Sequence, residues 1–177
     1  MIPLVQSYWV VRGRFLAGEY PGSRNPLGTP GRLNALFDAG VTVFVDLTAE
    51  NELDPYEPVL REEAARRGIA VTHERFPIPD YNVPESPSVM ARLLTAIDEH
   101  LAAGRTVYLH CWGGIGRTGT TVGCWLERHG MDGDEALAQL AAWWKDVPKS
   151  RLHKSSPETA WQKEYVREWA TLDPDIP

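Results

Sequence analysis

The sequence predicts a single α/β domain over residues 1–177, with a parallel-rich central sheet of four or five strands and helices on both faces. Three observations support this fold class. Short apolar runs alternate with longer segments of helical periodicity. Two of these runs, Val41–Leu47 and Val107–Leu109, are apolar enough for central strands that are buried on both faces. The second run continues through a glycine-rich loop into a buried helix, which is a typical strand-to-helix connection.

The other elements are marked by their terminal residues. Tyr8–Val11 and Phe15–Ala17 flank Arg12-Gly13-Arg14 and are expected to pair as a hairpin. Several helices are expected to begin after a capping Ser or Thr that is followed by proline, and to end at glycine. The expected helices span residues 30–39, 58–67, 87–103, 117–129 and 132–144, and a last helix begins at residue 157. Thr29, Ser86 and Ser156 are the expected caps of the helices that begin at residues 30, 87 and 157. One more strand is expected over residues 69–76.

Composition excludes several classes of protein. The formal net charge of −6 argues against general nucleic-acid binding. No apolar run is long enough for a membrane span, and the N-terminal stretch does not read as a signal peptide. Two cysteines cannot form a disulfide framework, and with scattered histidines they do not indicate a structural zinc site. We therefore expect a cytoplasmic protein without metal or other cofactor; its oligomeric state stays open.

The loop at residues 111–117 carries the strongest chemical signal. Cys111 opens it and Arg117 closes it, with Gly113, Gly114 and Gly116 between them. Such a turn before a helix directs backbone N–H groups at one point, which favours phosphate binding and a cysteine thiolate. The arginine fork can hold two phosphate oxygens. A nucleophile and a phosphate clamp on one loop predict phosphoryl transfer through a cysteinyl-phosphate.

The stretch His110-Cys111-Trp112-Gly113-Gly114-Ile115-Gly116-Arg117-Thr118 resembles the signature loop of the cysteine-dependent protein tyrosine phosphatase superfamily, His-Cys-x5-Arg followed by Ser or Thr. The resemblance implies that Cys111 is the nucleophile. Thr118 is expected to donate a hydrogen bond to the sulfur, and His110 to support the loop. Ala17–Pro21 also resembles an Ala-Gly-x-Tyr-Pro segment of the dual-specificity-like branch. The expected phosphate-binding residues are Trp112, Gly113, Gly114, Ile115, Gly116 and Arg117.

Two further residues complete the expected catalytic set. Asp80 lies in the proline-rich loop Pro77–Pro84, one helix and one strand before Cys111, where the superfamily carries its general acid. Gln162 follows the start of the last helix. Several phosphatases of this superfamily place a glutamine on a corresponding helix to orient the attacking water, so Gln162 is the candidate for that role. Helix packing is the simpler alternative for this segment.

Substrate class is the more open question. Within the superfamily that the loop resembles, the short chain favours the compact dual-specificity-like branch. Inositol-phosphate members of that superfamily often carry lysines within the loop, so the uncharged positions 112–116 favour a phosphoprotein substrate, especially phosphotyrosine, with phosphoserine and phosphothreonine as further possibilities. The basic segment Lys145–Lys154 could instead serve an inositol phosphate or phosphoinositide. A phosphate-binding module without turnover is a third reading. Arg24 is a weaker candidate for the site, and Cys124 is expected to be a core residue rather than a redox partner of Cys111.

Overall fold

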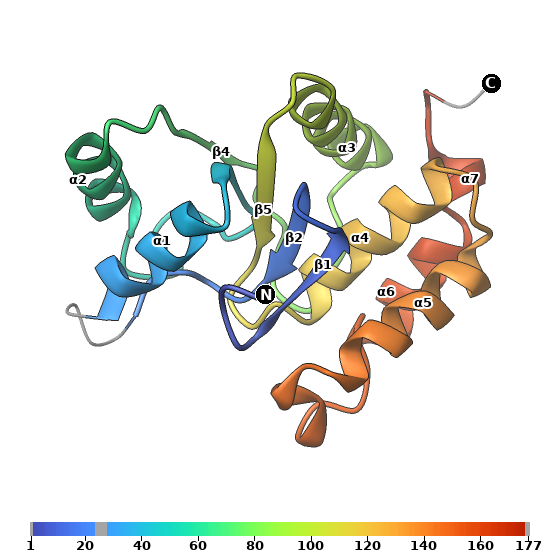
Figure 1. The fold of residues 1–177 in the computed structure, drawn as a ribbon. Helices are drawn as coiled ribbons and strands as arrows, with labels where there is room; N and C mark the ends of the chain where they lie inside the picture. The colour runs from blue at the N-terminus through green and yellow to red at the C-terminus, as the bar shows by residue number, and fades with distance from the viewer. Residues whose placement is uncertain (1, 24–27, 176–177) are drawn as a thin grey trace.

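The computed structural model describes residues 2–23 and 28–175 and contains one five-stranded sheet covered by helices on both faces (Figure 1). The strand order is β1-β2-β5-β3-β4. The first pair is antiparallel, as expected for the hairpin, and the other three pairs are parallel. The strands are β1 Ser7–Val11, β2 Phe15–Gly18, β3 Val41–Asp46, β4 Thr72–Arg75 and β5 Thr106–His110.

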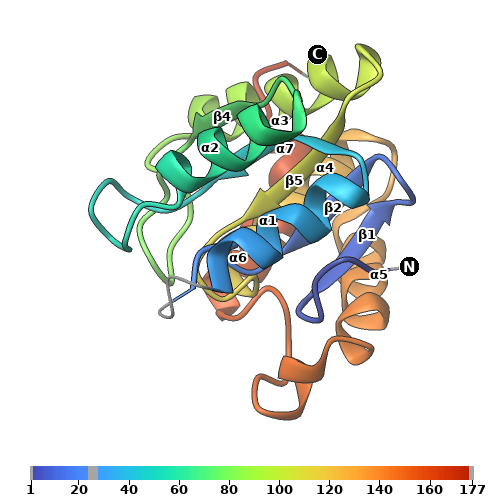
Figure 2. The same ribbon diagram turned by 60° about the vertical axis from the view of Figure 1, so that its left-hand side comes forward.

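The helices form one layer on each side of the sheet. Helices α1 and α2 cover one face and the remaining helices cover the other, as the two views together show (Figures 1 and 2). Within residues 2–23 and 28–175, no helix combines the length and apolar character needed to cross a bilayer. The helices are α1 Gly28–Asp38, α2 Glu57–Arg67, α3 Pro87–Ala102, α4 Gly116–Arg128, α5 Gly133–Lys145, the 3-10 turn η1 Pro148–Arg151, α6 Ala160–Arg167 and α7 Trp169–Leu172.

Alternation along the buried strands divides the core into two layers. In β5, Val107 and Leu109 pack with the helices α3 to α7, while Tyr108 between them packs with α1 and α2. All five residues of β5 are buried, because helices cover both sides of this central strand. The fold class predicted from the sequence is confirmed, and its central strands are the two most apolar runs.

The parallel strands end at one edge of the sheet. Gly18 and Asp46 both lie opposite His110, so the segments that follow β2, β3 and β5 leave the sheet side by side. Backbone hydrogen bonds continue the pairing beyond the strands, from Leu47 N to His110 O at 2.9 Å and from Ile78 N to Leu47 O at 3.0 Å. This edge is where open α/β sheets bind ligands.

Most predicted elements are present with small shifts at their ends, but two predicted helix caps are wrong. The final long helix begins at Ala160, with Thr159 as a cap that accepts a hydrogen bond from Gln162 N. Ser156 is instead buried and donates to Ile115 O at 2.8 Å. Thr29 lies inside α1, where its hydroxyl accepts from Ser23 N. In both cases a tertiary contact takes the side chain away from the capping position.

Glu127, near the end of α4, is an ionisable group in an unfavourable position. Its side chain is 7% exposed, and Oε2 has no hydrogen-bond partner among the described residues. Burial raises the pKa of Glu127 to about 7, against the effect of a backbone hydrogen bond from Ala170. Since an unfolded glutamate titrates near 4.3, ionising Glu127 in the folded protein costs free energy that the unfolded chain does not incur.

We expect this cost to appear as a pH-dependent loss of stability. Below about pH 4 both states carry the proton and the cost is absent; it grows as the pH rises and is complete above about pH 7. Glu127→Gln should therefore match the wild type in acid and exceed its free energy of unfolding by ~1–2 kcal/mol at pH 8. Denaturant melts across this range test it. Glu168→Gln, at an exposed position, is the control, and an equal pH trend in both variants would contradict the expectation.

Candidate active site

A cavity of about 840 Å³ opens at the carboxyl edge of the sheet. The predicted loop residues Cys111, Trp112, Gly113, Ile115 and Gly116 line it together with Asp80 from the proline-rich loop. The structure therefore brings the expected nucleophile and the expected general acid to one space. Within the described residues, no group of three or more His, Cys, Asp or Glu side chains is arranged to hold a metal ion.

The glycine-rich loop is held from several sides. Trp112 O accepts a hydrogen bond from Tyr20 N at 3.0 Å, which joins the loop to the segment after β2. Gly114 has a φ of +72°, and a Cβ there would lie 2.5 Å from the carbonyl carbon of Gly18. Only glycine fits both the backbone conformation and this approach. Cys111 is 3% exposed, so its thiol lies at the bottom of the cavity rather than at the surface.

Arg117, at the first turn of α4, is almost completely buried at 1% exposure. Its two terminal nitrogens donate to the carboxylate of Glu52 at 2.7 and 2.9 Å, a bidentate ion pair. Burial alone would lower the pKa of Arg117, but the hydrogen bonds to Glu52, together with the nearby Cys111 and Asp80, raise it. Nε has no hydrogen-bond partner among the described residues, which leaves one buried donor of the guanidinium unpaired.

Glu52 is the site residue that sequence reasoning missed. It lies in the loop after β3, where Ala49 N donates to its Oε2 at 2.9 Å. Partial burial would raise the pKa of Glu52, but hydrogen bonds from Arg117 and Ala49 lower it, so the group is ionised. The segment that carries Glu52 has no local motif. Glu52 can be recognised as a site residue only in the structure, where it lies opposite the buried Arg117.

Asp80 extends into the same cavity from the loop after β4. Its Oδ1 lies 3.0 Å from an Arg117 terminal nitrogen, and its side chain is 45% exposed. Ile78 O, in the same loop, accepts from the Arg117 guanidinium at 3.2 Å. The loop is therefore fixed against the arginine while its carboxylate stays open to the cavity, a position from which it can reach a group bound above Cys111.

Thr118 and His110 lie behind the loop and are both fully buried. The Thr118 hydroxyl has no hydrogen-bond partner among the described residues, so the expected bond to the sulfur is not formed in this state. His110 Nε2 lies 2.8 Å from the Tyr56 hydroxyl, and burial lowers the pKa of His110 to about 4. The ring is consequently neutral near pH 7 and its observed contacts are structural.

Gln162 is buried against the loop but its amide is already engaged. The Oε1 atom accepts from Glu158 N and Thr159 N, and Nε2 donates to Asn82 O at 3.0 Å, in the Asp80 loop. A Cβ on Gly116 would lie 2.9 Å from the amide of Gln162. The residue therefore sits between the glycine-rich loop and the Asp80 loop, and joins α6 to the latter.

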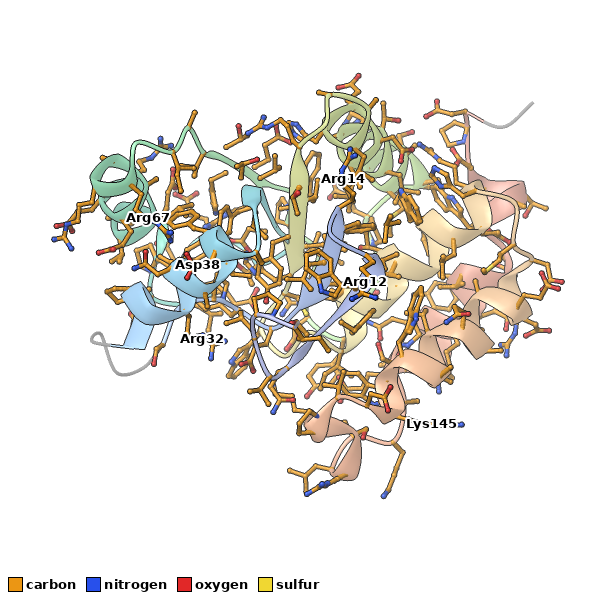
Figure 3. All side chains as sticks on the ribbon, in the orientation of Figure 1. Arg12, Arg14, Arg32, Asp38, Arg67 and Lys145 are labelled. Atoms are coloured by element: carbon orange, nitrogen blue, oxygen red, sulfur yellow. The ribbon has the colours of Figure 1, made fainter. Side chains whose placement is uncertain are left out.

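The basic segment expected to attract substrates divides into two parts. Lys149 and His153 line the cavity. Lys145, by contrast, points away from the sheet at the end of α5 (Figure 3). Arg24, the weaker candidate from the sequence, lies outside the described residues. Cys124 is a fully buried residue of α4, and burial raises the pKa of its thiol well above the usual value, as a core position would do.

Fold and loop together define the class of the cysteine-dependent phosphatases of the tyrosine and dual-specificity type. Comparison with known families identifies one family within this class. The chain belongs to the PTP-SAK family, described as the Swiss Army Knife protein, DSP-PTPase phosphatase domain, which it matches over residues 5–167. Residues 5–167 are therefore a phosphatase domain of the dual-specificity type.

Individual relatives agree with this assignment. The chain is 31% identical over 124 residues to "Putative tyrosine phosphatase 067L" of Invertebrate iridescent virus 3; the match covers 68% of this chain but spans less than half, 45%, of the viral protein. Tk-PTP in its active form is 28% identical with a TM-score of 0.63, covering 92% and 93% of the two chains. Kinase associated phosphatase, in a structure with its catalytic site cysteine replaced by serine, has a TM-score of 0.71 at 20% identity, covering 91% of this chain and 88% of that one.

Substitution of Gly114 tests the loop geometry against a matched neighbour. Gly114→Ala must place a methyl group against the backbone of Gly18 and Glu19 in a conformation that disfavours side chains. We expect a loss of roughly 2–4 kcal/mol in stability and weaker orthophosphate binding. At Gly113 the nearest contact for a Cβ is the Ile115 side chain at 3.3 Å, which can adjust. Equal effects of Gly113→Ala and Gly114→Ala, measured by melting and by phosphate titration, would refute this account.

Proposed function

We propose that residues 1–177 form one phosphatase domain that hydrolyses phosphotyrosine in proteins, through a cysteinyl-phosphate on Cys111. The observation that carries the proposal is that a thiol and a carboxylate line one cavity and that a buried guanidinium lies beside the carboxylate. The Cys111 thiol is at the base of the cavity, and Oδ1 of the partly exposed Asp80 lies 3.0 Å from Arg117, whose Nε has no hydrogen-bond partner among the described residues. A phosphate bound by the loop N–H groups of residues 112–117 and by Arg117 would stand over the sulfur.

In the first step the Cys111 thiolate attacks phosphorus, so that the S–P bond forms as the P–O bond to the leaving group breaks. Asp80 gives its proton to the departing oxygen. Because the phosphate oxygens compete with Asp80 for Arg117, substrate binding frees the carboxyl group to turn towards the leaving group. The fixed N–H dipoles and the guanidinium stabilise the charge that spreads over the three equatorial oxygens.

In the second step water attacks the phosphorus of the cysteinyl-phosphate. Asp80 takes the proton from this water, the O–P bond forms, and the S–P bond breaks to release phosphate and the thiolate. The Thr118 hydroxyl, buried and unpartnered among the described residues, is available to donate to the departing sulfur. The neutral His110 supports the loop from behind through its contact with Tyr56 and takes no proton.

An aromatic phosphate ester fits the walls of the cavity. Trp112 and Tyr81 are among the large hydrophobic side chains that remain exposed, at 50% and 61%, and both line the cavity. An aryl ring bound between the loop and the opening would bury part of these surfaces. The free thiols of Cys111 and Cys124 are in keeping with a reducing compartment, and we place the protein in the cytoplasm.

A second candidate substrate is an inositol phosphate or phosphoinositide, favoured by the presence of Lys149 and His153 on the cavity wall. PTPMT1 shares this fold, with a TM-score of 0.68 at 18% identity, and its structure contains PI(5)P. The same two-step chemistry would serve either substrate. A panel of phosphotyrosine, phosphoserine and phosphothreonine peptides beside inositol phosphates ranks the candidates directly.

Phosphate release by the wild type, Cys111→Ser and Asp80→Asn tests the chemistry. Cys111→Ser should abolish turnover. Asp80→Asn should lower the rate about 10²–10⁴-fold on phosphotyrosine, and much less on p-nitrophenyl phosphate, whose leaving group needs a proton less. Glu50→Gln removes an exposed acid of the loop after β3 and is the control. A well-folded wild type that binds phosphate but releases none from any substrate would leave a phosphate-binding module.

Gln162→Ala separates the expected water-orienting role from the contacts seen in the structure. If Gln162 orients water, only the second step slows, and the cysteinyl-phosphate accumulates in a rapid-quench experiment. If it acts as a positioning residue for the Asp80 loop through Asn82, both steps slow. The engaged amide leads us to expect the second result, with a rate loss of about tenfold or more on phosphotyrosine and little burst. Accumulation of the cysteinyl-phosphate with an unchanged rate of the first step would contradict the positioning role.

A further inference from the structure

The carboxylate of Glu19, just after β2, lies between two cations on the cavity wall. Its Oε1 is 2.6 Å from a terminal nitrogen of Arg32, on α1, and its Oε2 is 2.6 Å from Nζ of Lys149, in η1. All three side chains are 18–29% exposed and all three line the cavity. Figure 3 shows Arg32 projecting from α1, at the end nearer the carboxyl edge of the sheet.

This charge cluster is joined directly to the phosphate-binding loop. Lys149 Nζ also donates to Gly113 O at 2.9 Å, so one cation contacts both Glu19 and the loop that begins at Cys111. Arg32 is fixed by hydrogen bonds to Pro21 O and Tyr20 O, at 3.1 and 3.0 Å. Both cationic side chains are therefore held in place by hydrogen bonds to backbone carbonyl oxygens.

Two fixed cations on either side of one carboxylate are arranged as they would be around an anionic ligand. Here the anion belongs to the chain itself. A second phosphate on a substrate would have to displace a tethered carboxylate, which competes at a high effective concentration. The two other basic side chains of the site also have acidic neighbours: the Arg117 guanidinium is paired with Glu52, and His153 Nδ1 lies 3.3 Å from Glu158.

We propose that Glu19 is a specificity-determining residue that occupies the place of a second substrate phosphate and so restricts the site to singly phosphorylated groups. This rests on the proposed function only in placing the first phosphate in the loop at residues 111–117. The proposal explains how Lys149 can lie beside that loop without making it a polyphosphate site. The role of Lys149 is to hold Glu19 and Gly113 O together, rather than to bind substrate.

Binding to the full chain carrying Cys111→Ser, in which ligands are not turned over, tests the proposal by calorimetry at constant ionic strength. The probes are inositol hexakisphosphate and inositol 1-phosphate, which differ in the number of phosphates. In this background Glu19→Gln, which keeps hydrogen-bonding atoms at the same position, should tighten hexakisphosphate binding by about tenfold or more. The affinity for inositol 1-phosphate should change by less than about threefold.

Asp54→Asn is the matched control, because Asp54 lines the same cavity but its side chain forms no ion pair within the described residues. It removes one negative charge without releasing a cation, so we expect less than about a threefold change for both probes. Adding Lys149→Gln to Glu19→Gln should remove most of the gain in affinity for inositol hexakisphosphate, because the released cation is then lost. Melting curves confirm that each variant is folded.

The proposal is overturned if Glu19→Gln strengthens hexakisphosphate binding no more than Asp54→Asn does, which includes the case of no detectable binding by any variant. It is also overturned if both probes gain equally, since a general loss of negative charge would then suffice. Failure of the proposed function has a different signature. It appears as absent turnover by the wild type on every phosphate ester, whatever the ratio between the two probes.

Discussion

The buried guanidinium of Arg117 is the group on which the arrangement of the site depends. An isolated charge in a protein interior costs several kcal/mol unless it is paired and hydrogen-bonded. Glu52 supplies the bidentate partner, Asp80 a second carboxylate, and Ile78 O a further acceptor. Because these come from different loops, satisfying one arginine fixes the positions of the loops after β3 and β4 relative to the loop that precedes α4.

The parallel sheet makes this convergence possible. Strands β2, β3, β4 and β5 are in register at Gly18, Asp46, Arg75 and His110, so the chain turns away from the sheet at the same level four times. Asp80, the arginine partner Glu52 and Cys111 can then come from three separate connections. Differences in chemistry between proteins of this fold require changes only in these connections, and the core layers behind them can stay as they are.

Parts of the molecule that depend on local pattern could be predicted from the sequence. The glycine-rich loop is recognisable because its cysteine, glycines and arginine are contiguous, and the central strands because their apolar runs are continuous. Asp80 could be singled out because its proline-rich loop precedes Cys111 by one helix and one strand, as the general-acid loop does in the superfamily that the Cys111 loop resembles. The structure places its Oδ1 3.0 Å from Arg117, and its role as general acid stays a prediction.

What could not be predicted depends on contacts between distant segments. Glu52 is unremarkable in its own segment, and its importance follows from the buried arginine opposite it. Ser156 before Pro157 reads as a helix cap, yet its hydroxyl meets Ile115 O across the fold and α6 begins later. The contact of Lys149 with Glu19 and Gly113 joins three segments in the same way, and a sequence shows only that the first of these is basic.

The contacts of Ser156, Lys149 and Gln162 with the loop region have a consequence for how the protein matures during its synthesis. During synthesis, Glu19 and Tyr20 leave the ribosome first, residues 111–117 follow, and Lys149, Ser156 and Gln162 leave last. The loop therefore lacks part of its support until the chain has been made past residue 162 and α6 has docked. A nascent chain stalled before that point would carry the whole loop sequence without its full set of supporting contacts.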